Sequence, residues 1–174
     1  MNTLDCINTR RSRRQFTNRI VTDGLIKQII EAGIKAPSSR NSQPWHFVVI
    51  RDSDIQFALA RLKSEGNQEH ILSAPVTIIV CVDTKKSPNS FVEDGVCAVE
   101  NMLIAIHELG LGTVYVSAAS KTDAEVTNEI RNILGVPKTV VPLVILPVGY
   151  PDTSEKLEEK KLLNIDKVMH TDRW

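Results

Sequence analysis

Four short apolar runs, each rich in β-branched residues and separated from the next by a helical pattern, constrain the fold of this chain most strongly. They are residues 47–50, 75–82, 113–116 and 140–148. Runs of this length and composition are typical of buried strands. Strands that alternate with helices favour helices packed on the faces of one sheet. We therefore expect an α+β fold of three layers, α/β/α, around a mixed central sheet of four to five strands.

Details of these patterns predict where some elements lie. Residues 47–50 are apolar on both faces, which indicates a central strand. Pro142 interrupts the last run, and because proline cannot donate to a sheet ladder we expect an edge strand or a bulge there. Residues 94–109 place apolar side chains almost all round a helix. Such a helix lies at the centre of a fold or at a subunit interface, and we favour a dimer interface.

Length and composition indicate one ordinary globular domain over residues 1–174. Of the 174 residues, 42% are hydrophobic and 24% are charged, with acidic and basic residues in balance. The sequence has neither the basic excess that favours nucleic acid nor an apolar run long enough for a membrane span. Residues 152–174 are expected to form an extended C-terminal arm, because seven of the ten residues 152–161 are charged. Residues 165–174 regain strand-like character and are candidates to pair with a sheet edge, in the same subunit or another.

The cysteines and histidines indicate neither a metal centre nor a disulfide framework. Cys6, Cys81 and Cys97 follow no metal-ligand or redox spacing, and Cys81 and Cys97 lie within apolar patterns typical of small buried side chains. The four histidines lack cysteine or carboxylate partners at ligand spacing. The N-terminus also lacks the pattern of a signal peptide. We expect a reducing, cytoplasmic setting.

A polar loop over residues 36–45 separates a helical pattern from the first strand pattern. Pro37 ends the helix and Pro44 sets the entry to the strand, because each proline moves the residue before it out of helical space. The serine, asparagine and glutamine side chains between them donate and accept hydrogen bonds. The loop suits a planar ligand rich in heteroatoms, but clusters of this composition are also ordinary turn material.

A basic run, Arg10-Arg11-Ser12-Arg13-Arg14, follows a short predicted helix near the N-terminus. Guanidinium groups bind phosphate in a bidentate manner, and Ser12 adds a hydroxyl, so the run is a candidate phosphate clamp. Two simpler roles for the run stay open. Positive charge at a helix C-terminus complements the helix dipole without any ligand, and short basic runs also occur in nuclear-localisation or nucleic-acid patches.

The sequence lacks the motifs of several common classes of enzyme and nucleotide-binding protein. The chain has no Gly-x-Gly-x-x-Gly after a strand, no Gly-x-Ser-x-Gly and no Walker loop. It also shows no evident nucleophile or acid–base pair. A cofactor with its own reactivity would need only binding and orientation from such a protein.

The basic run, followed by Ala-Pro-Ser-Ser-x-Asn-x-Gln-Pro-Trp, resembles the nitroreductase-like family of FMN-dependent oxidoreductases. The resemblance extends over nearly the whole chain, through Asp94-Gly95, residues 110–112 and residues 148–151. It implies a homodimer with two FMN sites between subunits. It also implies a ping-pong reaction in which NADH or NADPH reduces the flavin and a nitroaromatic, quinone or similar flat electrophile then takes the electrons.

The resemblance also implies roles for individual residues. The phosphate and ribityl contacts would be Arg10, Arg11, Ser12 and Arg14, with Lys160 or Lys161 reaching the phosphate from late in the chain. The partner chain would present Pro37, Ser38, Ser39 and Asn41 to the flavin. The remaining contacts implied by the resemblance are a ribityl or ring contact at Asn67 and backbone positions near flavin N5 at Ser117 and Ala118. Many relatives have glycine where this chain has Ser117.

Two other classes of function remain open from the sequence. One is a flavin-binding protein of the same scaffold with another redox or flavin-handling role, such as reductive dehalogenation. The other is a non-enzymatic interaction protein whose arginines bind an acidic partner.

Overall fold

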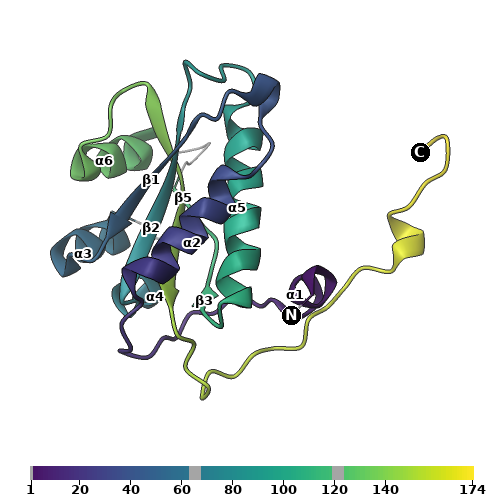
Figure 1. Ribbon diagram of the computed structural model, residues 1–174, viewed down its shortest axis with the longest axis horizontal. Coiled ribbons are helices and arrows are strands. Elements are labelled where there is room, and N and C mark those ends of the chain that lie inside the picture. Colours follow the sequence, from purple (N-terminus) through teal and green to yellow (C-terminus); the bar gives the residue numbers. More distant parts are fainter. Residues whose placement is uncertain (1, 63–67, 119–123) are drawn as a thin grey trace.

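The computed structural model describes residues 2–62, 68–118 and 124–174. Helices pack on both faces of one sheet, with α2 and α5 on one face and α3 and α6 on the other (Figure 1). This is the expected three-layer α+β architecture. The elements in chain order are α1 (Thr3–Thr9), α2 (Asp23–Ile34), the 3-10 helix η1 (Ser39–Asn41), β1 (Trp45–Ile50), α3 (Ser53–Leu62), α4 (Glu69–Leu72), β2 (Val76–Asp83), α5 (Phe91–Glu108), β3 (Gly112–Thr113), β4 (Val116–Ser117), α6 (Ala124–Leu134), β5 (Val140–Gly149) and the 3-10 helix η2 (Ile165–Lys167).

The five strands pair in the order β1-β2-β5-β3, and β4 pairs with β5 beside β3. All pairings among the described strands are antiparallel, so the prediction of a mixed sheet is wrong. Strand direction depends on how the chain returns through its helices, which an apolar pattern does not encode. The prediction for residues 47–50 is also wrong, because among the described strands β1 pairs with β2 alone and forms an edge.

Pro142 lies in β5, in the interior of the sheet. The register between β2 and β5 shifts next to it: Val80 pairs with Val144, whereas Cys81 pairs with Pro142. The extra residue on β5 forms a bulge that accommodates the missing N–H of proline. The predicted bulge is confirmed, and the alternative of an edge strand is wrong.

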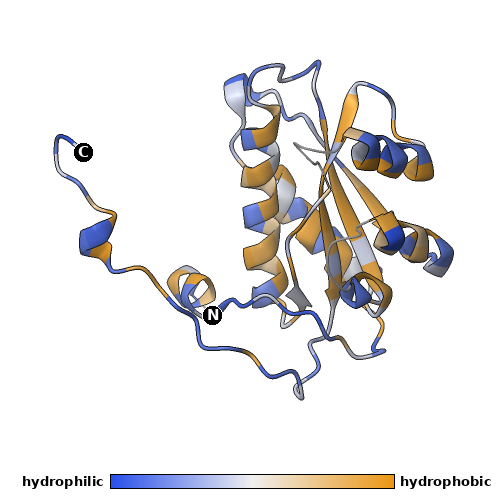
Figure 2. Ribbon diagram, turned by 180° about the vertical axis from the view of Figure 1, so that it is seen from behind, coloured by the Kyte–Doolittle hydropathy of each residue, from blue (hydrophilic) through white to orange (hydrophobic). Residues whose placement is uncertain are grey.

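The core consists of two apolar clusters, one on each face of the sheet. Alternate residues of β2 enter opposite clusters: Val80 packs with α2 and α5, and Ile79 and Cys81 pack with α3 and α6. Apolar colour lines the inner faces of the helices in Figure 2. A period of two along the strand explains this division.

The long helix α5 buries one face against the sheet and leaves the other face open in this single chain. Ala98, Val99 and Met102 are buried, whereas Val96 is 40% exposed. Cys97 is also exposed, which contradicts its expected burial, because it lies on the outer face of the helix beside Val96.

After Pro151 the chain runs past the N-terminal segment and then leaves the globule, as the yellow end of the ribbon shows (Figure 1). Residues 165–174 do not pair with the sheet of their own chain: residues 165–167 form η2, and residues 158–174 are exposed. Pairing with a sheet edge of another subunit stays a prediction. None of the described helices combines the length and apolar character that crossing a bilayer requires.

Candidate functional site: a cationic cleft and a distant polar loop

The segment with the arginine run is extended and attached to one end of the sheet. Arg10 ends α1, where its N–H donates to the carbonyl of Cys6 at 2.9 Å. The N–H of Arg13 then donates to the carbonyl of Thr113 at 2.8 Å. Phe16 forms an antiparallel bridge with Pro151 just after β5. These backbone contacts hold the run beside β3 and the start of the C-terminal arm.

A cleft of about 470 Å³ opens between the arginine run and this arm. It brings together five residues that the sequence predicted for one site: Arg10, Arg11, Ser12, Arg14 and Lys160. Lys161 is exposed and does not line the cleft. Of the two lysines, the structure therefore brings Lys160 to the arginines.

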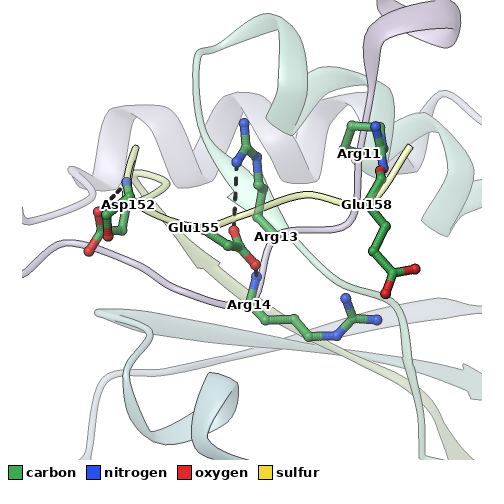
Figure 3. A network of polar contacts seen from close by, with 7 residues as sticks. Arg11, Arg13, Arg14, Asp152, Glu155 and Glu158 are labelled. Carbon is green, nitrogen blue, oxygen red and sulfur yellow. Dashed lines mark hydrogen bonds and ion pairs between the residues drawn. The ribbon is translucent and has the colours of Figure 1, made fainter. Parts of the chain in front are cut away.

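Carboxylates and carbonyls of the arm share the cleft with these cations. Glu155, Glu158 and Glu159 also line it. The guanidinium of Arg11 donates to the backbone carbonyl of Glu158, and Glu155 contacts both Arg13 and Arg14 (Figure 3). Arg13 does not line the cleft. The cleft is therefore cationic but partly compensated by the protein itself.

Two side-chain contacts attach α1 to the C-terminal end of α5. The thiol of Cys6 donates to Oε2 of Glu108 at 3.0 Å, and this hydrogen bond lowers the pKa of Glu108. Oγ1 of Thr9 lies 2.9 Å from Nε2 of His107. Desolvation, together with the positive charge of Arg10, lowers the pKa of His107. The arginine run thus begins at the C-terminal end of α5.

The polar loop is held at the other end of α5 by Asp94, a buried carboxylate that is 4% exposed. Its Oδ1 accepts from the backbone N–H of Ser39 at 2.8 Å. Its Oδ2 accepts from the hydroxyls of Ser87 at 2.7 Å and Ser42 at 3.3 Å. Sequence reasoning noted Asp94 only as part of the family resemblance. An acidic residue in the first turn of a long apolar helix was the available signal.

The loop itself is closely folded. The carbonyl of Ser38 accepts from the N–H of Asn41 at 3.0 Å, and Oγ of Ser38 accepts from the N–H of Gln43 at 3.1 Å. Arg40, Asn41 and Gln43 have φ values of 52°, 54° and 46°, in the left-handed region. Residues other than glycine adopt this region at an energetic cost, so the surrounding contacts must hold the loop.

The two groups of predicted residues lie far apart within one chain. Helix α5 has 18 residues and is therefore about 27 Å long. The loop is bonded to Asp94 at its start, and the segment before the arginines is bonded to His107 and Glu108 at its end (Figure 1). A single chain therefore does not bring Ser38, Ser39 and Asn41 to the cationic cleft.

Ser117 and Ala118, the predicted contacts near flavin N5, do not line the cleft. Ser117 lines a separate, mainly apolar cavity of about 560 Å³ together with Tyr115 and Leu143. Ala118 is fully buried, and its N–H donates to the carbonyl of Leu143 at 2.9 Å, so the sheet already uses this amide. Asn67 lies outside the described residues. Among the described residues, no group of three or more histidine, cysteine or acidic side chains could hold a metal ion.

Known proteins resemble this chain over its whole length. The family model described as the Nitroreductase family matches residues 7–65 and 52–150. A protein of Methanothermobacter thermautotrophicus, provisionally named NADH dehydrogenase/NAD(P)H nitroreductase, is 34% identical over 100% of this chain and 88% of its own length. An NADPH-flavin oxidoreductase of Vibrio harveyi is 30% identical over 99% of this chain and 75% of its own length.

A solved structure agrees with these sequence matches. The FMN-dependent nitroreductase of Clostridium difficile R20291 superimposes with a TM-score of 0.88 and 26% identity, over 98% of this chain and 99% of its own. The fold, the family model and the relatives thus indicate the same family as the two N-terminal motifs. This chain belongs to the nitroreductase family.

Proposed function

We propose that this protein uses NADH or NADPH to reduce nitroaromatics, quinones or similar flat electrophiles by a ping-pong mechanism, with FMN bound between two subunits. Its class is an NAD(P)H-dependent flavin oxidoreductase with FMN as cofactor, as family and relatives indicate. The acceptors, the ping-pong order and the dimeric site are the proposal.

The observation that carries the proposal is the cationic cleft. A phosphate monoester carries between one and two negative charges at neutral pH and binds best to guanidinium forks, ammonium groups and hydroxyl donors. Arg10, Arg11 and Arg14 supply the forks, Ser12 the hydroxyl and Lys160 the ammonium group, all around one cavity. The donor set therefore fits the phosphate of FMN.

Bound FMN would supply the electron transfer, taking two electrons from the nicotinamide and passing them to the acceptor. The protein's own residues have the tasks of binding and orientation. The arginine run would hold the phosphate end of FMN. The extended backbone that follows α1 and is bonded to β3 would fix the position of the run. If donor and acceptor use the same flavin face, the nicotinamide must leave before the acceptor enters, which produces ping-pong kinetics.

The separation of the two groups along α5 supports a site built from two chains. The outer face of α5 carries exposed apolar side chains, with Val92 39% and Val96 40% exposed. Apolar patches of this kind often mark subunit contacts. If a second copy packs on this face with its α5 antiparallel to the first, its own Pro37–Asn41 loop comes toward the cleft of the first copy. This agrees with the partner-chain role that the resemblance implies for that loop.

We also propose that residues 1–174 form one domain with residues 152–174 as its arm, and that the protein works in the cytoplasm. The three free cysteines support a reducing compartment.

A visible absorption spectrum of the purified protein, taken before and after anaerobic addition of NADH or NADPH, tests the function. We expect flavin bands that bleach on addition. Flavin that binds without bleaching would favour another electron donor or a flavin-handling role. A protein that takes up no flavin even after added FMN would refute the proposal and leave the arginines to a structural or acidic-partner role.

A further inference from the structure

The C-terminal arm turns sharply before it reaches the arginine run. The N–H of Asp152 donates to the carbonyl of Gln15 at 2.9 Å, which continues the bridge between Phe16 and Pro151. Oδ1 of Asp152 accepts from the N–H of Ser154 at 2.8 Å, and this hydrogen bond lowers the pKa of Asp152. The N–H of Glu155 donates back to the carbonyl of Asp152 at 3.2 Å. This turn directs Glu155 at the arginines.

The carboxylate of Glu155 reaches the arginine run from the arm. Its side chain is only 8% exposed and reaches between Arg13 and Arg14 (Figure 3). Oε1 accepts from the backbone N–H of Arg14 at 2.9 Å, and Oε2 lies 3.7 Å from Nη1 of Arg13. A carboxylate buried to this extent needs such partners, because its desolvation is costly.

Arg13 has a different role from the other arginines of the run. Its side chain lies against Gly112, where a Cβ would come within 2.8 Å of Cβ and 2.9 Å of Cγ of Arg13. Glycine at position 112 therefore makes room for Arg13 against the sheet edge, and its guanidinium meets Glu155 rather than the cleft. The run is thus divided into one structural arginine and three that line the cleft.

We propose that Glu155 is a positioning residue of the phosphate site. It fixes the backbone at Arg14 while keeping Arg13 out of the cleft, and it anchors the arm five residues before Lys160 so that this lysine reaches the cleft. This inference deepens the proposed function and rests on it. A carboxylate beside a phosphate site would ordinarily oppose phosphate binding through charge repulsion, so the positioning role predicts an effect of opposite sign.

The test compares the affinities of FMN and riboflavin, measured by quenching of flavin fluorescence. Riboflavin lacks the phosphate, so the ratio of the two affinities isolates the phosphate end. We expect Glu155→Ala to weaken FMN binding about tenfold, the scale of one charge-assisted hydrogen bond. Riboflavin binding should change less than about twofold.

Glu159→Gln is the matched control, because Glu159 lines the same cleft on the same arm. Removing its charge should make FMN binding tighter, because a negative charge beside the phosphate is lost. If Glu155→Ala also leaves FMN unchanged or tightens it, Glu155 acts only as a nearby charge and the inference is wrong. Equal weakening of FMN and riboflavin would show a general structural defect and would also refute it.

A double-mutant cycle tests the link to Lys160. Lys160→Ala should weaken FMN in the wild-type background and have less effect beside Glu155→Ala, because the anchor that precedes Lys160 is then already lost. Fully additive losses would contradict the anchoring role.

A readout without flavin keeps the inference separate from the proposed function. The amide of Arg14 should exchange its proton with solvent at least about tenfold faster in Glu155→Ala than in Glu159→Gln. Failure of the wild-type protein to bind FMN would refute the proposed function, whereas equal exchange rates at Arg14 would refute the role of Glu155.

Discussion

Replacing Asp94 with alanine tests how the polar loop is held at the start of α5. The carboxylate accepts two short hydrogen bonds, from Ser39 at 2.8 Å and Ser87 at 2.7 Å, and a longer one from Ser42 at 3.3 Å. A hydrogen bond to a charged group contributes about 1.5–3 kcal/mol. The two short bonds share one carboxylate and are not fully additive. We therefore expect Asp94→Ala to lower the free energy of unfolding by about 3–5 kcal/mol.

Urea denaturation measures this loss through the transition midpoint at constant m-value. Glu93→Ala is the matched control, because Glu93 precedes Asp94 in the same first turn but is exposed. Removing the Glu93 carboxylate should lower the free energy of unfolding by only about 0.3–1 kcal/mol, the scale of a charge near a helix N-terminus. The stability of Asp94→Asn should fall between those of Asp94→Ala and Glu93→Ala. An amide oxygen still accepts from Ser39, while the amide NH₂ donates to a hydroxyl.

The same variants also test whether the polar loop contributes to FMN binding. Because Ser39 is bonded to Asp94, FMN affinity should fall in Asp94→Ala and stay near the wild-type value in Glu93→Ala. If both alanine variants lose equal stability, the charge at the helix end holds the loop, and the role given to the buried hydrogen bonds is wrong.

Three further predictions address the cleft, the helix junction and the subunit contact. Arg14→Ala should weaken FMN by about 1.5–3 kcal/mol in a fluorescence titration, and unchanged affinity would show that the phosphate is bound elsewhere. Desolvation and Arg10 lower the pKa of His107, so the unfolded chain binds this proton more tightly and wild-type stability should fall as the pH drops below about 6.5. In His107→Gln, denaturation across this pH range should show a smaller slope, and an identical slope would contradict the assignment. Val96→Arg should reduce the sedimentation mass to that of one 19.4 kDa chain and abolish FMN binding, whereas a dimer that persists would place the interface elsewhere.

Elements that depend on neighbouring residues could be predicted from the sequence. Thr22 caps α2, with Oγ1 accepting from the N–H of Leu25, and a threonine directly before an amphipathic pattern is a common local signal for a helix start. Gly110 and Gly135 follow the ends of α5 and α6 at φ values of 72° and 64°, the conformation that glycine adopts most readily. The basic run and the polar loop could also be recognised in the sequence, because each consists of consecutive residues of the relevant type.

Features that depend on long-range contacts were not predictable in this way. The pattern of residues 47–50 fits a central strand, yet β1 forms an edge, because strand order depends on the path of the whole chain. The exposure of Cys97 follows from which face of α5 meets the sheet, and an almost uniformly apolar pattern does not specify that face.

The sequence by itself determined the family, the classes of secondary structure and the residue types of the candidate phosphate site, because these depend on local composition and spacing. Only the tertiary structure decided how those residues are used. The contact between Ser39 and Asp94 spans 55 positions, and the contact between Arg14 and Glu155 spans 141. Such contacts form only when the sheet and its helices bring distant segments together. In the folded chain Lys160 lines the cleft, Arg13 does not, and the polar loop lies at the far end of α5.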